Sequence, residues 1–179
     1  LYNGAYWYEI DKNEFQSFLG EAAEKMGVTK YNARYFQFKE QLIKQFLSSS
    51  YLPTPVVSPD LVKINLLNGT YQITPQGSQL NKFNSEDFIT YQLPFAYDPK
   101  ATAPIFQAYL NKVLPEKELQ LILAEFIGFV FMKNGNSSIK FEKTLMLYGG
   151  GANGKSVFFQ IVNALLGSEN VSSYSLQSL

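Results

Sequence analysis

Residues 149–156 constrain the fold of this chain more than any other segment. They read Gly-Gly-Gly-Ala-Asn-Gly-Lys-Ser and fit the pattern G-x-x-x-x-G-K-[ST] at every fixed position. Glycines let a backbone curl around a phosphate without Cβ clashes, and the backbone N–H groups then point inward beside the positive end of a helix dipole. The segment therefore predicts a phosphate-binding loop that joins a strand to a helix.

The flanking residues favour the same interpretation. Residues 144–148 are mostly apolar and predict a short buried strand that runs directly into the glycines. From Ser156 onward, apolar residues recur at helical spacing until Gly167, which predicts the end of the helix; they are Val157, Phe158, Ile161, Val162, Leu165 and Leu166. A chance glycine-rich turn is the alternative, and the strand and helix patterns weigh against it.

The candidate nucleotide-binding residues are all eight members of the segment: Gly149, Gly150, Gly151, Ala152, Asn153, Gly154, Lys155 and Ser156. We expect Lys155 to reach the β- and γ-phosphate oxygens and the Ser156 hydroxyl to bind Mg²⁺. The motif thus predicts a nucleoside triphosphate with Mg²⁺ as the ligand.

Composition excludes several other chemistries. The 179 residues include no cysteine and no histidine, so disulfides, thiolate or imidazole metal sites and Ser-His or Cys-His catalysis are excluded. A metal would have to be bound by oxygen, and Mg²⁺ fits that requirement. No apolar run approaches the ~20 residues of a membrane span and no signal-peptide pattern opens the chain, which predicts a cytoplasmic protein without membrane contact.

Charge gives no overall sign of a nucleic-acid partner, because the formal net charge is zero. A local basic cluster lies near the loop and consists of Lys133, Lys140, Lys143 and Lys155 beside Glu142. It is either a solvated face or a DNA contact, and the solvated face is the preferred interpretation. Arg34 is the sole arginine, so we do not expect an arginine finger from this chain.

The pattern along the chain predicts three segments, at residues 1–50, 51–138 and 139–179. In the first, Asn3-Gly4 indicates a hairpin turn, Asp11 with Glu14 resembles a capping box, and a helix should end at Gly27. A second helix is expected over residues 32–47, with Tyr35, Phe38, Leu42, Ile43 and Phe46 facing inward. Aromatic residues on these helices either stack on bases or pack in the core, and core packing is preferred.

The second segment opens with a proline-rich linker at residues 51–59. Alternating residues on both sides of Asn68-Gly69 predict a β-hairpin over residues 62–73, whereas residues 74–100 receive no firm assignment. Helices are expected over residues 104–114 and 116–132, followed by a loop at 134–138. The buried face of the second helix should comprise Leu119, Ile122, Leu123, Phe126, Ile127 and Val130.

Four stretches occur in an order that resembles a known family. They are the hairpin from Val62 to Gly69, Leu93-Pro94-Phe95-Ala96-Tyr97-Asp98-Pro99, Glu125-Phe126-Ile127-Gly128, and the loop with its preceding Tyr148. Together they look like the phage and plasmid primase-helicases related to the poxvirus primase-helicase, whose motors belong to helicase superfamily three. Asn153 directly before Gly154 matches this branch, whereas many other members of the superfamily place that asparagine one residue earlier, where this chain has Ala152.

The resemblance implies a replicative motor: a ring, commonly a hexamer, that hydrolyses ATP to translocate on single-stranded DNA and unwind a duplex. It implies an α+β protein in which a mostly helical accessory domain with short β-hairpins, at residues 51–138, leads into the first strand-loop-helix unit of a P-loop α/β ATPase. ATP and Mg²⁺ would be bound by the loop.

Hydrolysis requires a second acidic group for Mg²⁺ and the attacking water. Glu169 is the sole carboxylate after Ser156 and no apolar strand precedes it, so no Walker B acid, sensor or arginine finger can be assigned. We therefore expect a motor domain truncated at its end and no robust ATPase from these residues alone.

Two other functions remain open. The residues before the loop could form a DNA-binding or oligomerisation collar of such a protein, or the chain could belong to another P-loop NTPase such as a packaging motor or a kinase. Priming chemistry cannot be placed on these residues.

Overall fold

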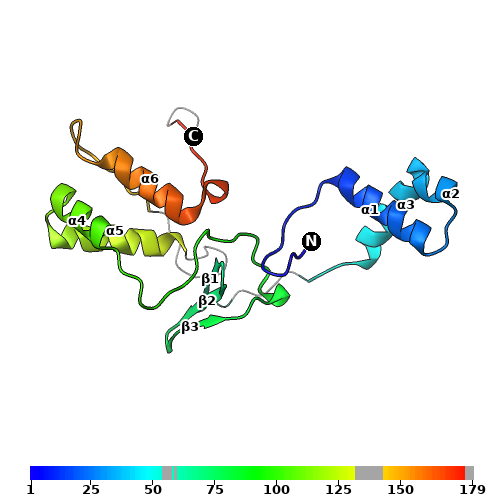
Figure 1. The fold of residues 1–179 in the computed structure, drawn as a ribbon, viewed down its shortest axis with the longest axis horizontal. Helices are drawn as coiled ribbons and strands as arrows, with labels where there is room; N and C mark the ends of the chain where they lie inside the picture. The colour runs from blue at the N-terminus through cyan, green and yellow to red at the C-terminus, as the bar shows by residue number, and fades with distance from the viewer. Residues whose placement is uncertain (54–57, 59, 132–142, 176–179) are drawn as a thin grey trace. The chain divides into compact units, whose positions relative to one another are not determined.

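The structure is a computed structural model that describes residues 1–53, 58, 60–131 and 143–175. Over these residues the chain is α+β, with six α-helices and one three-stranded antiparallel sheet (Figure 1). This confirms the expected class. Contacts divide the chain into two compact units, one formed by Leu1–Asn3 and Trp7–Val56 and the other by Gly4–Tyr6 and Val57–Leu179. No helix among the described residues is long and apolar enough to cross a membrane.

Two local signals at the start of the N-terminal unit formed as predicted. Tyr2 and Trp7 pair across the expected Asn3-Gly4 turn. Helix α1, Lys12–Lys25, begins at Asp11, whose carboxylate accepts backbone N–H groups from the first helical turn.

The predicted helix over residues 32–47 is wrong as a single helix. The structure instead contains α2, Lys30–Arg34, and α3, Phe36–Ser49, separated by Tyr35 in extended conformation with φ −67° and ψ 129°. Packing explains the break, because α2 turns Ala33, which has no exposed surface, against Gly20 of α1. Of the five residues expected to face inward, only Ile43 is buried, while Tyr35 and Phe46 are exposed.

The C-terminal unit contains the sheet, which is a meander of β1, Val62–Leu66, β2, Gly69–Thr74, and β3, Gly77–Asn81. The predicted hairpin is confirmed, with Val62 opposite Ile73 and Leu66 opposite Gly69. Strand β3 lies in the stretch without a firm assignment and pairs with β2 from Thr70–Asn81 to Thr74–Gly77.

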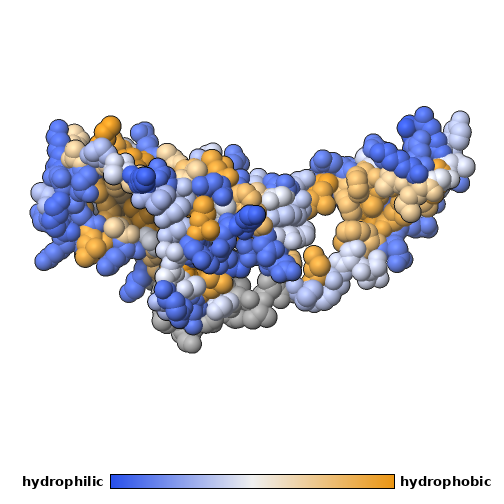
Figure 2. Space-filling model, turned by 60° about the horizontal axis from the view of Figure 1, so that its bottom comes forward, coloured by the Kyte–Doolittle hydropathy of each residue, from blue (hydrophilic) through white to orange (hydrophobic). Residues whose placement is uncertain are grey.

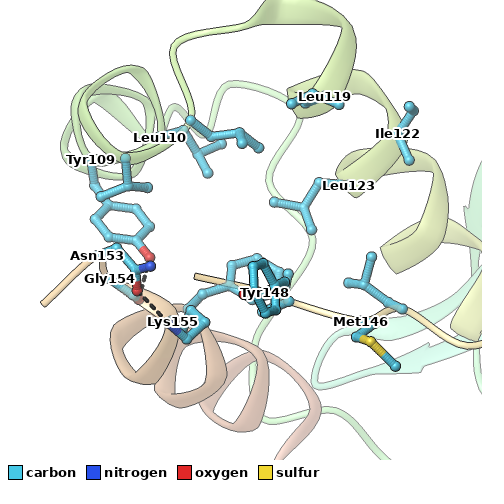
Figure 3. A pocket seen from close by; sticks show the side chains of 15 residues that line it. Tyr109, Leu110, Leu119, Ile122, Leu123, Met146, Tyr148, Asn153, Gly154 and Lys155 are labelled. Atoms are coloured by element: carbon cyan, nitrogen blue, oxygen red, sulfur yellow. Dashed lines mark hydrogen bonds between the residues drawn. The ribbon is translucent and has the colours of Figure 1, made fainter. Parts of the chain in front are cut away.

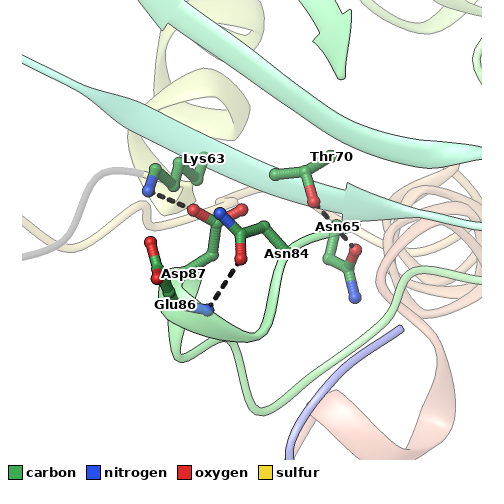
Figure 4. A network of polar contacts seen from close by, with 6 residues as sticks. All are labelled: Lys63, Asn65, Thr70, Asn84, Glu86 and Asp87. Carbon is green, nitrogen blue, oxygen red and sulfur yellow. Dashed lines mark hydrogen bonds and ion pairs between the residues drawn. The ribbon is translucent and has the colours of Figure 1, made fainter. Parts of the chain in front are cut away.

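A polar network fixes the segment after β3 to the sheet (Figure 4). Asn65 is fully buried, and its amide donates to the carbonyl oxygens of Ala5 at 3.1 Å and Tyr91 at 2.9 Å, while its Oδ1 accepts the hydroxyl of Thr70. Lys63 forms a 2.5 Å ion pair with Asp87, which belongs to the short 3₁₀ turn η1, Ser85–Asp87. These contacts order residues for which the sequence has no regular pattern.

Three further helices complete the unit: α4, Pro104–Val113, α5, Lys117–Val130, and α6, Lys155–Leu166, followed by the 3₁₀ turn η2, Ser168–Asn170. All three α-helices were predicted, including the proline at the start of α4 and Gly167 at the end of α6. Their core consists of Leu110, Leu123 and Phe158, one from each helix. Helix α6 is therefore held by the two helices that precede the loop.

Two predictions for this unit need correction. Residues 144–148 contain no strand, because a strand requires a hydrogen-bonded neighbour and no described residue pairs with them. The buried face of α5 is Gln120 with Leu123, whereas Leu119, Ile122 and Val130 are exposed. Other described apolar side chains are exposed as well, and the face of the molecule in Figure 2 shows several orange areas among the blue.

Several expectations lie outside the described residues. They are most of the proline-rich linker (54–57 and 59), the loop at 134–138, and Lys133, Lys140 and Glu142 of the basic cluster.

Candidate nucleotide-binding site

The candidate loop ends at the N-terminus of α6. Gly154 is the residue that caps this helix, with φ 84° and ψ −4°, and its carbonyl accepts the N–H of Phe158 at 3.0 Å. A glycine cap offers no side-chain oxygen, so the first-turn N–H groups of α6 have no capping side chain from this position. Such a terminus carries a partial positive charge that favours an anion.

Lys155 closes the loop on itself. Its ammonium group donates three hydrogen bonds, to the carbonyl oxygens of Gly149 at 2.8 Å and Gly150 at 3.0 Å and to Oδ1 of Asn153 at 2.6 Å. An ammonium has three N–H donors, so all of them are used inside the loop. The predicted residues 149, 150, 153 and 155 are thus brought together around one positive charge.

Gly149 is exposed, and the side-chain atoms nearest to it belong to the loop itself. A Cβ placed there would clash with Nδ2 of Asn153 and would lie 3.5 Å from the Lys155 ammonium nitrogen. Gly150 and Gly151 have open space on their Cβ side, and Ala152 adopts a left-handed conformation with φ 60°. The middle of the loop therefore faces outward, while its start contacts only the loop's own Asn153 and Lys155.

Tyr109 of α4 supports the loop and was not predicted as a site residue. Its hydroxyl donates to the Gly154 carbonyl at 2.7 Å (Figure 3). A Cβ at Gly154 would lie 2.9 Å from Cγ1 of Val113 and 3.1 Å from the Tyr109 hydroxyl oxygen. No sequence signal identifies Tyr109, because it lies 45 positions before Gly154 and reads as an ordinary residue of a helical stripe.

An apolar cavity of about 280 Å³ adjoins the loop. Leucines of α4 and α5 and the segment leading into the loop form most of its wall, and Lys155 and Asn153 lie at one side (Figure 3). Residues 144–148 therefore lie beside apolar side chains even though they form no strand. A second cavity, of about 350 Å³, is lined by Leu145 and Phe158 together with other residues of α5 and α6.

The donor set at the loop fits a phosphate chain with Mg²⁺. Lys155 supplies a positive charge, α6 supplies N–H groups, and Ser156 is exposed in the first turn of α6. Mg²⁺ keeps several waters and binds phosphate oxygens, so the Ser156 hydroxyl would supply one protein ligand of its shell. Among the residues that the structure describes, no group of three or more acidic side chains could hold a metal ion by itself.

The chain is thus an α+β protein in which helices α4 and α5 pack against α6, and the glycine-rich loop with Lys155 lies at the N-terminus of α6. Residues 1–115 match the family described as "D5 N terminal like", which is more than half of the chain, so the chain belongs to this family. This domain is found in phage, plasmid and viral primase-helicase proteins. None of the curated proteins compared with the chain matches it.

The match agrees with the resemblance drawn from the sequence and indicates a DNA-replication context for the domain. It ends at residue 115, within the connection between α4 and α5, and so does not include the loop. Helix α4, which carries Tyr109, lies inside the matched residues.

Proposed function

We propose that this chain is part of an ATP-dependent DNA helicase of the primase-helicase class, and that residues 149–156 bind the triphosphate of ATP together with Mg²⁺. In this proposal Lys155 binds the β- and γ-phosphates, Ser156 binds the metal, and the full-length protein is a ring that translocates on single-stranded DNA. The family match supports the replication context.

The observation that carries the proposal is the arrangement of Lys155. Its three hydrogen-bond acceptors are two backbone carbonyls and one amide oxygen, all of them neutral. Phosphate oxygens are charged acceptors and form stronger hydrogen bonds with an ammonium than neutral acceptors do. A triphosphate can therefore replace these contacts, while the loop keeps the lysine beside the N-terminus of α6.

Ala152 and the glycines determine how the phosphates would reach the loop. Gly150, Gly151 and Ala152 are all exposed, so a ligand can approach the outer side of the loop without displacing packed side chains. The inner side is fixed by the Tyr109 hydrogen bond to Gly154. The site is thus open toward solvent and supported from behind.

Nucleotide binding by the full chain tests the proposal. We expect Lys155→Ala to weaken the binding of a fluorescent ATP analogue by about 10- to 150-fold, since a hydrogen bond to a charged group contributes about 1.5–3 kcal/mol. Lys143→Ala removes the same charge from an exposed position shortly before the loop and should bind normally. Equal affinities for the two variants would refute the site.

The metal is tested in the same assay. Chelation of Mg²⁺ should weaken ATP binding by the unaltered chain. The Ser156→Ala variant should bind ATP with this weaker affinity whether or not Mg²⁺ is present. A Ser156→Ala variant that retains the full Mg²⁺ effect would contradict the assignment of this hydroxyl.

A further inference from the structure

The N-terminal unit contains six cations and six carboxylates, which balance, but five of the six cations lie in one stretch far along the chain from the loop. Residues 25–44 contain Lys25, Lys30, Arg34, Lys39 and Lys44 and a single carboxylate, Glu40, a net charge of +4 in a chain whose net charge is zero. Arg34 is the only arginine in the chain, and its side chain is 66% exposed. Its contact with Glu24 is long, at 3.7 Å, and an exposed pair of this kind is weak.

Large aromatic rings are exposed in the same stretch. Tyr31 is 92% exposed on α2, and Tyr35 and Phe36 are 50% and 60% exposed at the junction of α2 and α3. The rings of Tyr35 and Phe36 lie 5.2 Å apart with an interplanar angle of 62°. The preferred sequence interpretation, in which the rings of the predicted inward face pack in the core, is therefore wrong for Tyr35.

The break between α2 and α3 creates this surface. Because Ala33 is the residue that α2 buries, its neighbours Lys30, Tyr31 and Arg34 remain exposed. Extended backbone at Tyr35 then starts α3 with Phe36. Cations and rings consequently alternate along a single short turn, Lys30-Tyr31 followed by Arg34-Tyr35-Phe36, which we term the basic-aromatic turn.

We propose that the basic-aromatic turn binds single-stranded DNA, with bases stacking on Tyr31 and phosphates contacting Lys30 and Arg34. Exposed aromatic rings beside cations are the combination by which proteins bind unpaired strands, because every base has a face that can stack and every nucleotide carries a phosphate. A duplex hides the faces of its bases, so the rings favour the single strand. The choice of DNA as the nucleic acid rests on the proposed function; the surface itself is independent of the loop.

Binding of a fluorescein-labelled oligothymidylate by the full chain, measured by anisotropy, tests this proposal. Tyr31→Ala should weaken binding by roughly 5- to 150-fold, the range expected when one base can no longer stack. Tyr31→Phe keeps the ring and should bind nearly normally. A Lys30→Ala, Arg34→Ala double variant should weaken binding and lower the salt slope by about 0.7 for each phosphate that the variant no longer neutralises.

Two control variants replace an exposed tyrosine and an exposed lysine by alanine outside the basic-aromatic turn. Tyr174→Ala removes an exposed tyrosine of the C-terminal unit, and Lys12→Ala removes an exposed lysine next to Asp11. Both should bind the oligonucleotide like the unaltered chain. Circular dichroism of each variant establishes that the helices are retained.

Three results would overturn the proposal: no binding of the oligonucleotide by the unaltered chain, equal weakening in the control variants, or a change of oligomeric state on Tyr31→Ala without loss of DNA affinity. The last result would identify the turn as a protein interface. Lys155→Ala separates this proposal from the nucleotide site, because it should leave oligonucleotide affinity without nucleotide unchanged. If the unaltered chain does not bind ATP but Tyr31→Ala still weakens oligonucleotide binding as expected, only the assignment of the loop as a nucleotide site is rejected.

Discussion

Replacement of Gly154 by alanine should disrupt the junction between the loop and α6. The residue has φ 84°, and an L-amino acid in this region costs about 1–2 kcal/mol. The new Cβ would also lie 2.9 Å from Val113 and 3.1 Å from the Tyr109 hydroxyl, so side chains of α4 would have to move. Overpacking of this kind typically costs about 1–3 kcal/mol. The two terms give a destabilisation of about 2 kcal/mol or more.

Amide hydrogen exchange of α6 measures this effect locally, which is appropriate for a chain of two compact units. A loss of about 2 kcal/mol should increase the exchange rates of the α6 amides about 30-fold. Gly151→Ala is the matched control, because its Cβ meets no atom within 4 Å and its φ is not in the left-handed region. Tyr109→Phe removes the 2.7 Å hydrogen bond and keeps the ring, and should cost about 0.5–1.5 kcal/mol.

Equal exchange in Gly154→Ala and Gly151→Ala would refute the reasoning, since the expected difference arises from backbone conformation and close packing at one glycine and not at the other. Increased exchange in both variants would show that the whole loop requires glycine. Either result is independent of whether the chain binds a nucleotide.

Two further predictions concern the sheet. Asn65→Ala should cost about 2 kcal/mol, measured by exchange of the β1 and β2 amides, because it removes a fully buried amide that donates to the half-buried carbonyl groups of Ala5 and Tyr91. Asn13→Ala, at an exposed position, should have no such effect, and equal exchange in both variants would contradict the role of Asn65. Burial raises the pKa of Tyr91, whose hydroxyl donates to the Lys63 carbonyl at 3.1 Å. The resulting stability is fully present below the unfolded pKa of 10.0 and is lost as the pH rises through the higher folded-state pKa. Between neutral pH and about pH 11, Tyr91→Phe should therefore lose less stability in denaturant titrations than the unaltered chain, and an equal loss would contradict this assignment.

Local signals predicted much of the fold because they act over a few residues. The Asp11 cap, the Asn68-Gly69 turn, the proline at the start of α4 and Gly167 after α6 all do what their chemistry predicts. The division of residues 32–47 at Tyr35 was not predictable in this way, since it depends on the fit of Ala33 against another helix.

The candidate site shows the same limit. The sequence predicts all of residues 149–156 as site residues because the motif is contiguous, and the structure gathers Gly149, Asn153 and Lys155 around one ammonium group. Tyr109 could not be found, since its contact with Gly154 joins positions 45 apart. The strand expected before the loop is not observed, because pairing of a strand depends on a neighbour and not on its own residues.

Sequence alone thus determined the glycine-rich loop, the start of α1 and α4, the end of α6 and the hairpin of β1 and β2. Backbone preference and side-chain spacing, on which these features depend, are properties of short segments. Tertiary structure decided which apolar faces are buried, which tyrosine supports the loop and which aromatic rings remain exposed, because packing brings together residues that no local pattern relates. In this chain the buried Ala33 of α2 leaves Tyr31 exposed, and that outcome depends on Gly20, more than ten positions earlier.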